Sequence, residues 1–185
     1  MARAKALREF ESPRFRFDMN ITLIGMPGSG KSYIGKKLAL GLGFRLIELD
    51  QIMEDSYKKP LQGILDEMGD TAFLAQQSQD AINETSGCTN TIISPGGSII
   101  YGEDAMRHLQ QISTIVYLKT SLNVIEQRIT ALPRGIVGLR AKTFSAIYAE
   151  RTVLYTQWAD IVIDADRDSL EILNDIQRQI VSPAT

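Results

Sequence analysis

The most informative segment of the chain is Gly25-Met26-Pro27-Gly28-Ser29-Gly30-Lys31-Ser32. It fits the pattern G-x-x-x-x-G-K-[ST], which is typical of a loop that wraps a phosphate group. Glycines allow several backbone N–H groups to point inward, Lys31 supplies positive charge for the β- and γ-phosphates, and Ser32 offers a hydroxyl to Mg²⁺. The segment therefore predicts nucleotide binding.

The residues on either side of this loop support the same interpretation. The apolar run Ile21-Thr22-Leu23-Ile24 precedes it and has the pattern of a strand buried on both faces. Residues 31–42 follow it with apolar side chains at helical spacing. A helix that begins at the loop turns the positive end of its dipole toward a bound anion.

The rest of the chain alternates apolar runs with segments of helical periodicity. Further strands are expected at residues 44–49, 91–94, 114–118 and 161–163, and further helices at 51–86, 102–111, 122–131, 141–158 and 169–180. The segment 51–86 is interrupted near Lys59-Pro60 and near Gly69. This alternation indicates βαβ units, so we expect an α/β fold of three layers, with a five-stranded parallel sheet and helices on both faces.

Length and charge indicate the domain organisation. The chain has 185 residues, 44% of them apolar, which suits a single domain that we place at residues 19–185. Residues 1–18 contain five basic and three acidic residues, a net charge of +2, and lack the apolar segment of a secretory signal. We expect residues 1–18 to form a flexible N-terminal extension.

Composition also excludes several classes of function. With 20 basic and 22 acidic residues, a net charge of −2, the chain has no excess of positive charge for a nucleic-acid-binding surface. No apolar run approaches the ~20 residues that cross a bilayer, so no membrane partner is expected. One cysteine and one histidine exclude an intrachain disulfide and a multi-histidine metal site. A cytoplasmic location fits these features.

Four further elements are candidates for the chemistry. Glu48-Leu49-Asp50 ends the second expected strand, where Asp50 could accept a proton from a hydroxyl and Glu48 could orient the waters of Mg²⁺. Pro95-Gly96-Gly97-Ser98 follows the third strand and allows a ligand close to the backbone. Arg134 lies in a glycine-containing loop suited to a lid, and Arg151 lies in the long helix that follows. Each is also compatible with a structural role: a solvated acidic pair, an ordinary turn, a solvated basic loop, a helix residue facing solvent.

Taken together, these elements resemble the shikimate kinase family of small P-loop kinases. The resemblance extends from about Asn20 to about Ile180. It implies a P-loop kinase fold with acceptor-binding helices at about residues 50–90 and a mobile lid at about residues 132–142. It also implies ATP and Mg²⁺ as cofactors and a small hydroxylated carboxylate as the acceptor. Separately, we expect a monomer.

The resemblance carries a role for each motif residue. The catalytic residues would be Lys31, Asp50 and Arg134. The nucleotide would contact Gly25, Gly28, Ser29, Gly30, Lys31, Ser32, Tyr33 and Arg128, and the metal would contact Ser32 and Glu48. The acceptor would contact Asp50, Gly96, Gly97 and Arg151. In the segment Arg151-Thr152-Val153-Leu154-Tyr155, the arginine would hold the acceptor's carboxylate.

Three motifs depart from the family. The family's glycine triplet reads Pro95-Gly96-Gly97, the first Asp of its D-x-D pair is Glu48, and the third departure lies in an acceptor-binding helix. The family carries F-R-x-x-E in an acceptor-binding helix, where the arginine pairs with the carboxylate of shikimate. The corresponding segment here is Phe73-Leu74-Ala75-Gln76-Gln77. Loss of a bidentate arginine–carboxylate contact costs about 2–5 kcal/mol, or roughly 30-fold to several thousand-fold in affinity. The acceptor half therefore matches the family less well than the phosphate-binding half.

We expect ATP-dependent phosphorylation of a hydroxyl on a small anionic metabolite, with conversion of shikimate to shikimate 3-phosphate in aromatic amino-acid biosynthesis as the leading interpretation. Leu74 and Gln77 keep two alternatives open. One is a kinase of another hydroxylated metabolite, similar to the gluconate kinases. The other is a nucleotide-binding module with impaired catalysis, against which Lys31, Ser32 and Asp50 weigh.

Overall fold

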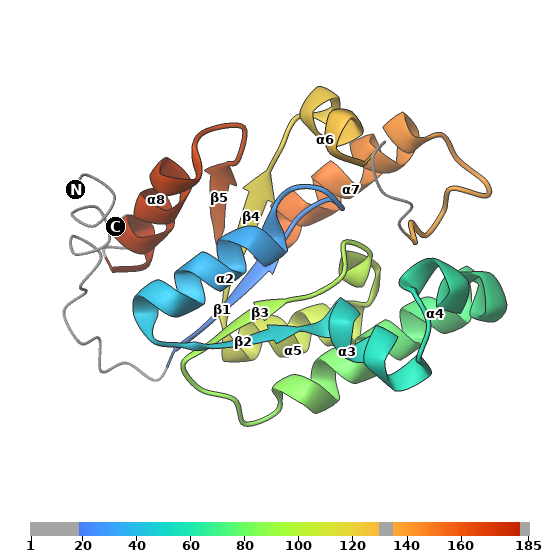
Figure 1. The fold of residues 1–185 in the computed structure, drawn as a ribbon, viewed down its shortest axis with the longest axis horizontal. Helices are drawn as coiled ribbons and strands as arrows, with labels where there is room; N and C mark the ends of the chain where they lie inside the picture. The colour runs from blue at the N-terminus through green and yellow to red at the C-terminus, as the bar shows by residue number, and fades with distance from the viewer. Residues whose placement is uncertain (1–18, 130–134, 182–185) are drawn as a thin grey trace.

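The centre of the fold is a five-stranded parallel sheet, seen in a computed structural model that describes residues 19–129 and 135–181 (Figure 1). The strands are β1 (Asn20–Ile24), β2 (Arg45–Glu48), β3 (Thr91–Ser94), β4 (Thr114–Lys119) and β5 (Ile161–Asp164). Their spatial order is β2-β3-β1-β4-β5, and each neighbouring pair is parallel. The expected α/β class and parallel sheet are therefore confirmed. The expected extension, residues 1–18, lies outside the described residues.

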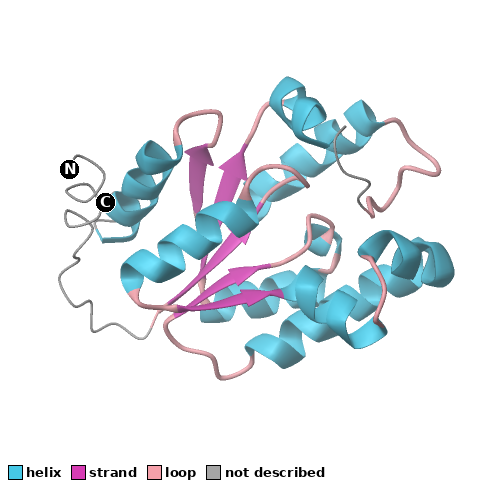
Figure 2. Cartoon of the chain, viewed as in Figure 1, coloured by secondary structure: helices cyan, strands magenta, loops and turns pink. Residues whose placement is uncertain are grey.

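Helices cover both faces of this sheet and complete three layers (Figure 2). One face packs against α2 (Lys31–Leu42) and α8 (Ser169–Val181), and the other against α5 (Glu103–Ile112) and α7 (Phe144–Trp158). The remaining helices are α3 (Leu49–Tyr57), α4 (Leu61–Thr85), α6 (Leu122–Ile129) and the short 3-10 helix η1 (Ile99–Tyr101).

Two apolar cores lie between these layers, because alternate residues of each strand point to opposite faces. On β1, Leu23 belongs to the core beneath α2 and α8, whereas Ile24 belongs to the core beneath α5 and α7. On β4, Val116 and Tyr117 divide in the same way. This double burial explains why the strands read as short continuous apolar runs in the sequence.

The segment between β2 and β3 forms a separate apolar cluster, which we call the α3–α4 cluster. It consists of Met53, Ile64, Leu65, Phe73 and Val137. The expected interruptions of this helical segment are present. Lys58, with φ 54°, ends α3 before Pro60, and Gly69, with φ 73° and ψ 165°, kinks α4. Val137 reaches the cluster from the loop that precedes α7 and so links that loop to α4.

Some element boundaries differ from the prediction. The expected strand 44–49 ends at Glu48, so Asp50 lies in the first turn of α3 rather than at a strand end. The long helix begins at Phe144 instead of residue 141, and the side chain of its N-cap, Thr143, accepts a hydrogen bond from the Ala146 N–H at 3.3 Å. None of the helices in the described ranges is long and apolar enough to cross a membrane.

Candidate active site

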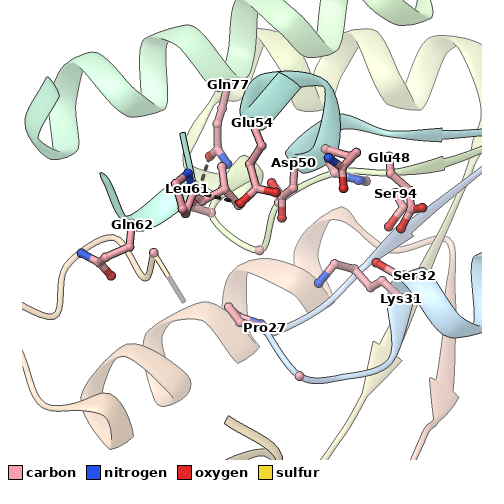
Figure 3. A pocket seen from close by; sticks show the side chains of 18 of the residues that line it. Pro27, Lys31, Ser32, Glu48, Asp50, Glu54, Leu61, Gln62, Gln77 and Ser94 are labelled. Carbon is pink, nitrogen blue, oxygen red and sulfur yellow. Dashed lines mark hydrogen bonds between the residues drawn. The ribbon is translucent and has the colours of Figure 1, made fainter. Parts of the chain in front are cut away.

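A cleft of about 450 Å³ opens at the carboxyl ends of the strands. Its wall combines the loop after β1, the β2–α3 junction, the loop after β3, and parts of α4, α6 and α7. Figure 3 shows Lys31 and Ser32 on one side of the cleft, with Asp50 and Gln77 on the other. The predicted site residues that line it are Gly28, Gly30, Lys31, Ser32, Tyr33, Glu48, Asp50, Gly96, Gly97, Arg128 and Arg151. One cleft therefore brings together predicted site residues from five separate segments of the chain.

The glycine-rich loop leads directly into the first turn of α2. Gly30, the N-cap residue, has φ 97°, a left-handed conformation that favours glycine, and no side chain caps the helix. The ammonium of Lys31 donates hydrogen bonds to the carbonyl oxygens of Gly25 at 2.9 Å and Met26 at 3.2 Å. Gly25 and Ser29 lie behind the cleft wall, and Ser29 is buried. The loop thus holds a positive charge beside uncapped helix N–H groups.

The outer rim of the cleft carries Tyr33 and Arg128. Arg128, on α6, donates a hydrogen bond from Nη1 to the carbonyl oxygen of Gly28 at 3.1 Å, so it lies against the loop. The exposed ring of Tyr33 faces the ammonium of Lys37, whose hydrogen bond lowers the pKa of the Tyr33 hydroxyl, with a smaller contribution from Ser169.

Two carboxylates stand where β2 passes into α3. Glu48 ends β2, is half-buried, and pairs with Lys36 of α2 at 3.1 Å. Asp50 lies two residues further on, in the first turn of α3, and its Oδ1 atom approaches Gly96 in the loop after β3. Both carboxylates line the cleft, as does the glycine-rich loop. The site therefore offers hard oxygen ligands close to the expected position of phosphate groups.

The loop after β3 fits between the two sides of the cleft without space for side chains. A Cβ atom on Gly96 would lie 2.3 Å from Gln77 Nε2 and 2.5 Å from Asp50 Oδ1. A Cβ atom on Gly97 would lie 2.8 Å from Cδ of Pro27 in the glycine-rich loop. These contacts explain why both positions are glycine.

Among the residues that the structure describes, Arg151 is the largest fully buried side chain, with 1% of its surface exposed, and it lines the cleft. Its Nη2 donates to the carbonyl oxygen of Val137 at 2.9 Å, and its Nε donates to the hydroxyl of Tyr101 at 3.4 Å, with the Tyr101 ring 5.3 Å from the guanidinium carbon. Within residues 19–129 and 135–181, no carboxylate lies within 4.0 Å of this guanidinium.

The carboxylate next in sequence, Glu150, is engaged elsewhere. It forms an ion pair with Lys142 and accepts a hydrogen bond from the Tyr101 hydroxyl at 2.9 Å. The hydrogen bond from Lys142 holds the pKa of Glu150 below its ordinary value, and burial raises the pKa of Tyr101. Arg151 therefore remains a buried cation that is paired with neutral groups.

The structure also places residues whose positions the sequence left open. Leu74 does not line the cleft and packs instead against the α3–α4 cluster. Gln77 and Ser98 do line it, and the Ser98 hydroxyl donates to Gln77 Oε1 at 2.6 Å. No local pattern marks this pair, because it joins α4 to the loop after β3. Arg134, together with residues 130–133, lies outside the described residues.

The residues present fit a magnesium nucleotide. The uncapped N-terminus of the 12-residue helix α2 provides backbone donors for phosphate oxygens, next to the Lys31 ammonium. The Ser32 hydroxyl and the Glu48 carboxylate supply the hard oxygen donors that Mg²⁺ prefers. Arg128 at the rim offers a planar group at the outer end of the same cleft.

Comparison with known proteins agrees with this geometry. Residues 27–181 match the family model described as shikimate kinase. A shikimate kinase from Persephonella marina is 32% identical over 163 residues, covering 87% of this chain and 98% of that protein. A shikimate kinase from Rippkaea orientalis is 31% identical over 170 residues, covering 88% of each.

The solved structures give the same result for the fold. The shikimate kinase from Acinetobacter baumannii, solved in complex with shikimate, matches with a TM-score of 0.79 and 23% identity, covering 95% of this chain and 97% of that one. The family model and the two relatives confirm the resemblance inferred from the motifs and the expected kinase class. On the extent of the family match and the identity to these relatives, the chain belongs to the shikimate kinase family.

Proposed function

We propose that the protein transfers the γ-phosphoryl group of ATP to a hydroxyl of shikimate, which yields shikimate 3-phosphate. The observation that carries this proposal is the meeting of three groups in one cleft: the loop that contains Lys31, the Asp50 carboxylate, and the buried Arg151 guanidinium. Membership of the family and the shikimate held by the Acinetobacter baumannii structure support shikimate as the acceptor.

On the nucleotide side, the residues of the chain position the phosphate groups and neutralise their negative charge. Lys31 neutralises negative charge on the transferred group from its place beside the loop carbonyls. Ser32 and Glu48 would hold Mg²⁺, which when bound neutralises phosphate charge. Arg128, Tyr33 and the loop backbone form the rest of the proposed nucleotide site. Arg134 is included as a catalytic residue because of its place in the glycine-containing loop of the sequence.

On the acceptor side, two groups of opposite charge act at different positions. Asp50 orients the acceptor hydroxyl and takes its proton as the bond to phosphorus forms. Arg151 holds the carboxylate of the acceptor. A guanidinium carries five N–H donors, and the described contacts to Val137 and Tyr101 use two of them, which leaves donors for a carboxylate. Gly96 and Gly97 allow the acceptor to lie against the backbone between these groups.

A second candidate acceptor is another small hydroxy acid. The observation that favours it is Leu74, which packs in the α3–α4 cluster and adds no positive charge to the cleft. Among the described residues, the arginines that line the cleft are Arg128 at the nucleotide rim and Arg151 at the inner end. The acceptor carboxylate therefore meets one described arginine.

An ADP-release assay with a panel of acceptors separates these candidates. The purified full chain with ATP and Mg²⁺ is tested against shikimate, gluconate, homoserine and nucleoside monophosphates. We expect shikimate to give the highest kcat/KM. A higher value with gluconate or homoserine would overturn shikimate as the acceptor, and tight ATP binding without stimulation by any compound would overturn the kinase activity itself.

A further inference from the structure

Gln77 is a polar side chain held almost completely inside the protein at the wall of the cleft. It lies on α4, beyond the Gly69 kink, and only 7% of its surface is exposed. Its Oε1 accepts the hydrogen bond of the Ser98 hydroxyl at 2.6 Å. This contact ties α4 to the loop after β3 and fixes one side of the carboxamide.

The other side of the carboxamide, the Nε2 donor, faces the acceptor end of the cleft. Nε2 and Asp50 Oδ1 both lie against Gly96, since a Cβ atom there would be 2.3 Å from the first and 2.5 Å from the second. Figure 3 shows Gln77 and Asp50 reaching the same part of the cleft from two helices. The opposite orientation of the amide would turn its oxygen toward the carboxylate, so the network itself selects the donor for this position.

The Nε2 group has hydrogen-bonding capacity left for a ligand. In residues 19–129 and 135–181, no side chain or carbonyl accepts a hydrogen bond from it. Nε2 is not one of the buried polar atoms that lack a partner, so it is accessible to the cleft and can donate to water or to a bound ligand. Because this donor lines the cleft beside Asp50, an acceptor molecule bound there can supply an oxygen that accepts from it.

We propose that Gln77 is a specificity-determining residue: its Nε2 donates a hydrogen bond to an uncharged oxygen of the acceptor, adjacent to the hydroxyl that Asp50 orients. This inference rests on the proposed function. A neutral donor beside a carboxylate suits a hydroxyl better than a carboxylate, because Asp50 repels negative charge. The site therefore selects a vicinal diol, with the acceptor's carboxylate at Arg151 and a second hydroxyl at Gln77.

The test is a comparison of two enzymes with two acceptors. The acceptors are shikimate and 4-deoxyshikimate, which lacks the hydroxyl next to the phosphorylated one. Gln77→Met keeps the size of the side chain and removes the donor. Gln79→Met, on the exposed side of the same helix, is the matched control. For Gln77→Met we expect the KM for shikimate to rise about tenfold, as for the loss of one hydrogen bond, with the KM for ATP unchanged.

With 4-deoxyshikimate, Gln77→Met and the wild type should have equal KM values, because the oxygen that Nε2 contacts is absent. Gln77→Glu provides a second variant that still accepts from Ser98; it should bind shikimate at least as weakly as Gln77→Met, since it adds negative charge beside Asp50. An equal penalty with both acceptors, or no penalty with shikimate, would overturn the role of Gln77. A wild-type enzyme inactive with shikimate would instead overturn the proposed function.

Discussion

Arg151 places a charged side chain inside the protein, with 1% of its surface exposed. Removing a charge from water costs several kcal/mol unless nearby groups compensate it. In the described structure the compensation comes from the carbonyl oxygen of Val137 and from the hydroxyl and ring of Tyr101, all of them neutral. Under the proposed function, the carboxylate of the acceptor completes this set, so the cost serves ligand binding.

Tyr155 supports the same region through its buried hydroxyl group. Its hydroxyl donates to the carbonyl oxygen of Gly97 at 2.5 Å, and its ring stacks on Tyr117 with 5.0 Å between centroids. Burial raises the pKa of Tyr155 far above its ordinary value of 10.0, so the hydroxyl stays protonated as a donor. The Tyr155 side chain thus holds Gly97 against the glycine-rich loop.

Tyr155→Phe should lower the free energy of unfolding by about 1–3 kcal/mol near neutral pH, because it leaves the Gly97 carbonyl without its buried donor. The raised pKa in the folded state means that the wild-type advantage is complete below pH 10.0. Above that pH it declines by about 1.4 kcal/mol per unit, since the unfolded chain releases this proton first.

Urea unfolding of both proteins at about pH 7 and about pH 11 measures this effect. The control is Tyr57→Phe, at an exposed position on α3. Its free energy of unfolding should differ little from that of the wild type at either pH. A stability difference between wild type and Tyr155→Phe that stays constant from neutral to alkaline pH would contradict the buried hydroxyl as its source.

Among the elements, the loop before α7 is docked on α4 by three kinds of contact. Val137 enters the α3–α4 cluster, and the Gly138 N–H donates to Asp70 Oδ2 at 2.9 Å. Arg140 pairs with Asp66 at 2.6 Å on the surface and lowers the pKa of that carboxyl. Because the Val137 carbonyl also accepts from Arg151, the loop, α4 and the acceptor site form one connected unit.

Asp70→Ala should loosen this loop, because the Gly138 N–H loses its acceptor. We expect hydrogen exchange of the Gly138 amide to accelerate about tenfold, in keeping with the loss of one hydrogen bond. Asp66→Ala removes only an exposed ion pair, which contributes about 0–1 kcal/mol, and should change this exchange far less. Equal acceleration in both variants would show that the surface pair, rather than Asp70, holds the loop.

The sequence predicts well those elements whose position is set by residues within the element itself or next to it. Double burial gives the strands continuous apolar runs, and Pro60 and Gly69 mark the interruptions of the α3–α4 segment. The helix η1 was missed because three residues do not establish a period. The predicted start of α7 was three residues early, since its position depends on the Thr143 cap rather than on periodicity.

Local motifs and the family resemblance predicted many of the residues that line the cleft, but not how their side chains are oriented. The glycine-rich loop is recognisable from residues 25–32 alone. The orientation of Arg151 depends on Val137 and Tyr101, and that of Gln77 depends on Ser98, so neither follows from its own helix. Contacts between distant segments decide these orientations, and local patterns do not contain them.

At the scale of the whole molecule, the strand order explains how the site is assembled. β1 lies at the centre of the sheet, with β3 on one side and β4 on the other, so the loops after β1 and β3 are neighbours. Open α/β sheets bind ligands at such a point, outside the carboxyl ends of the strands. The α3–α4 segment then adds Asp50 and Gln77, and α7 adds Arg151.

This arrangement separates two tasks between two parts of the molecule. The loop after β1, on the nucleotide side, is one continuous segment of the chain. The acceptor side is formed by residues from α3, α4, α7 and the loop after β3. Phosphoryl transfer depends mainly on positioning and charge, so the reaction requires both parts to hold their substrates at once.

The most direct test of this account is phosphoryl transfer from γ-labelled ATP to shikimate, with the product identified after separation. The wild type should form labelled shikimate 3-phosphate. Asp50→Asn should bind both substrates and form the product about 100- to 10,000-fold more slowly, since it cannot take the proton. Transfer by Asp50→Asn at the wild-type rate, or no labelled shikimate phosphate from the wild type, would contradict the account.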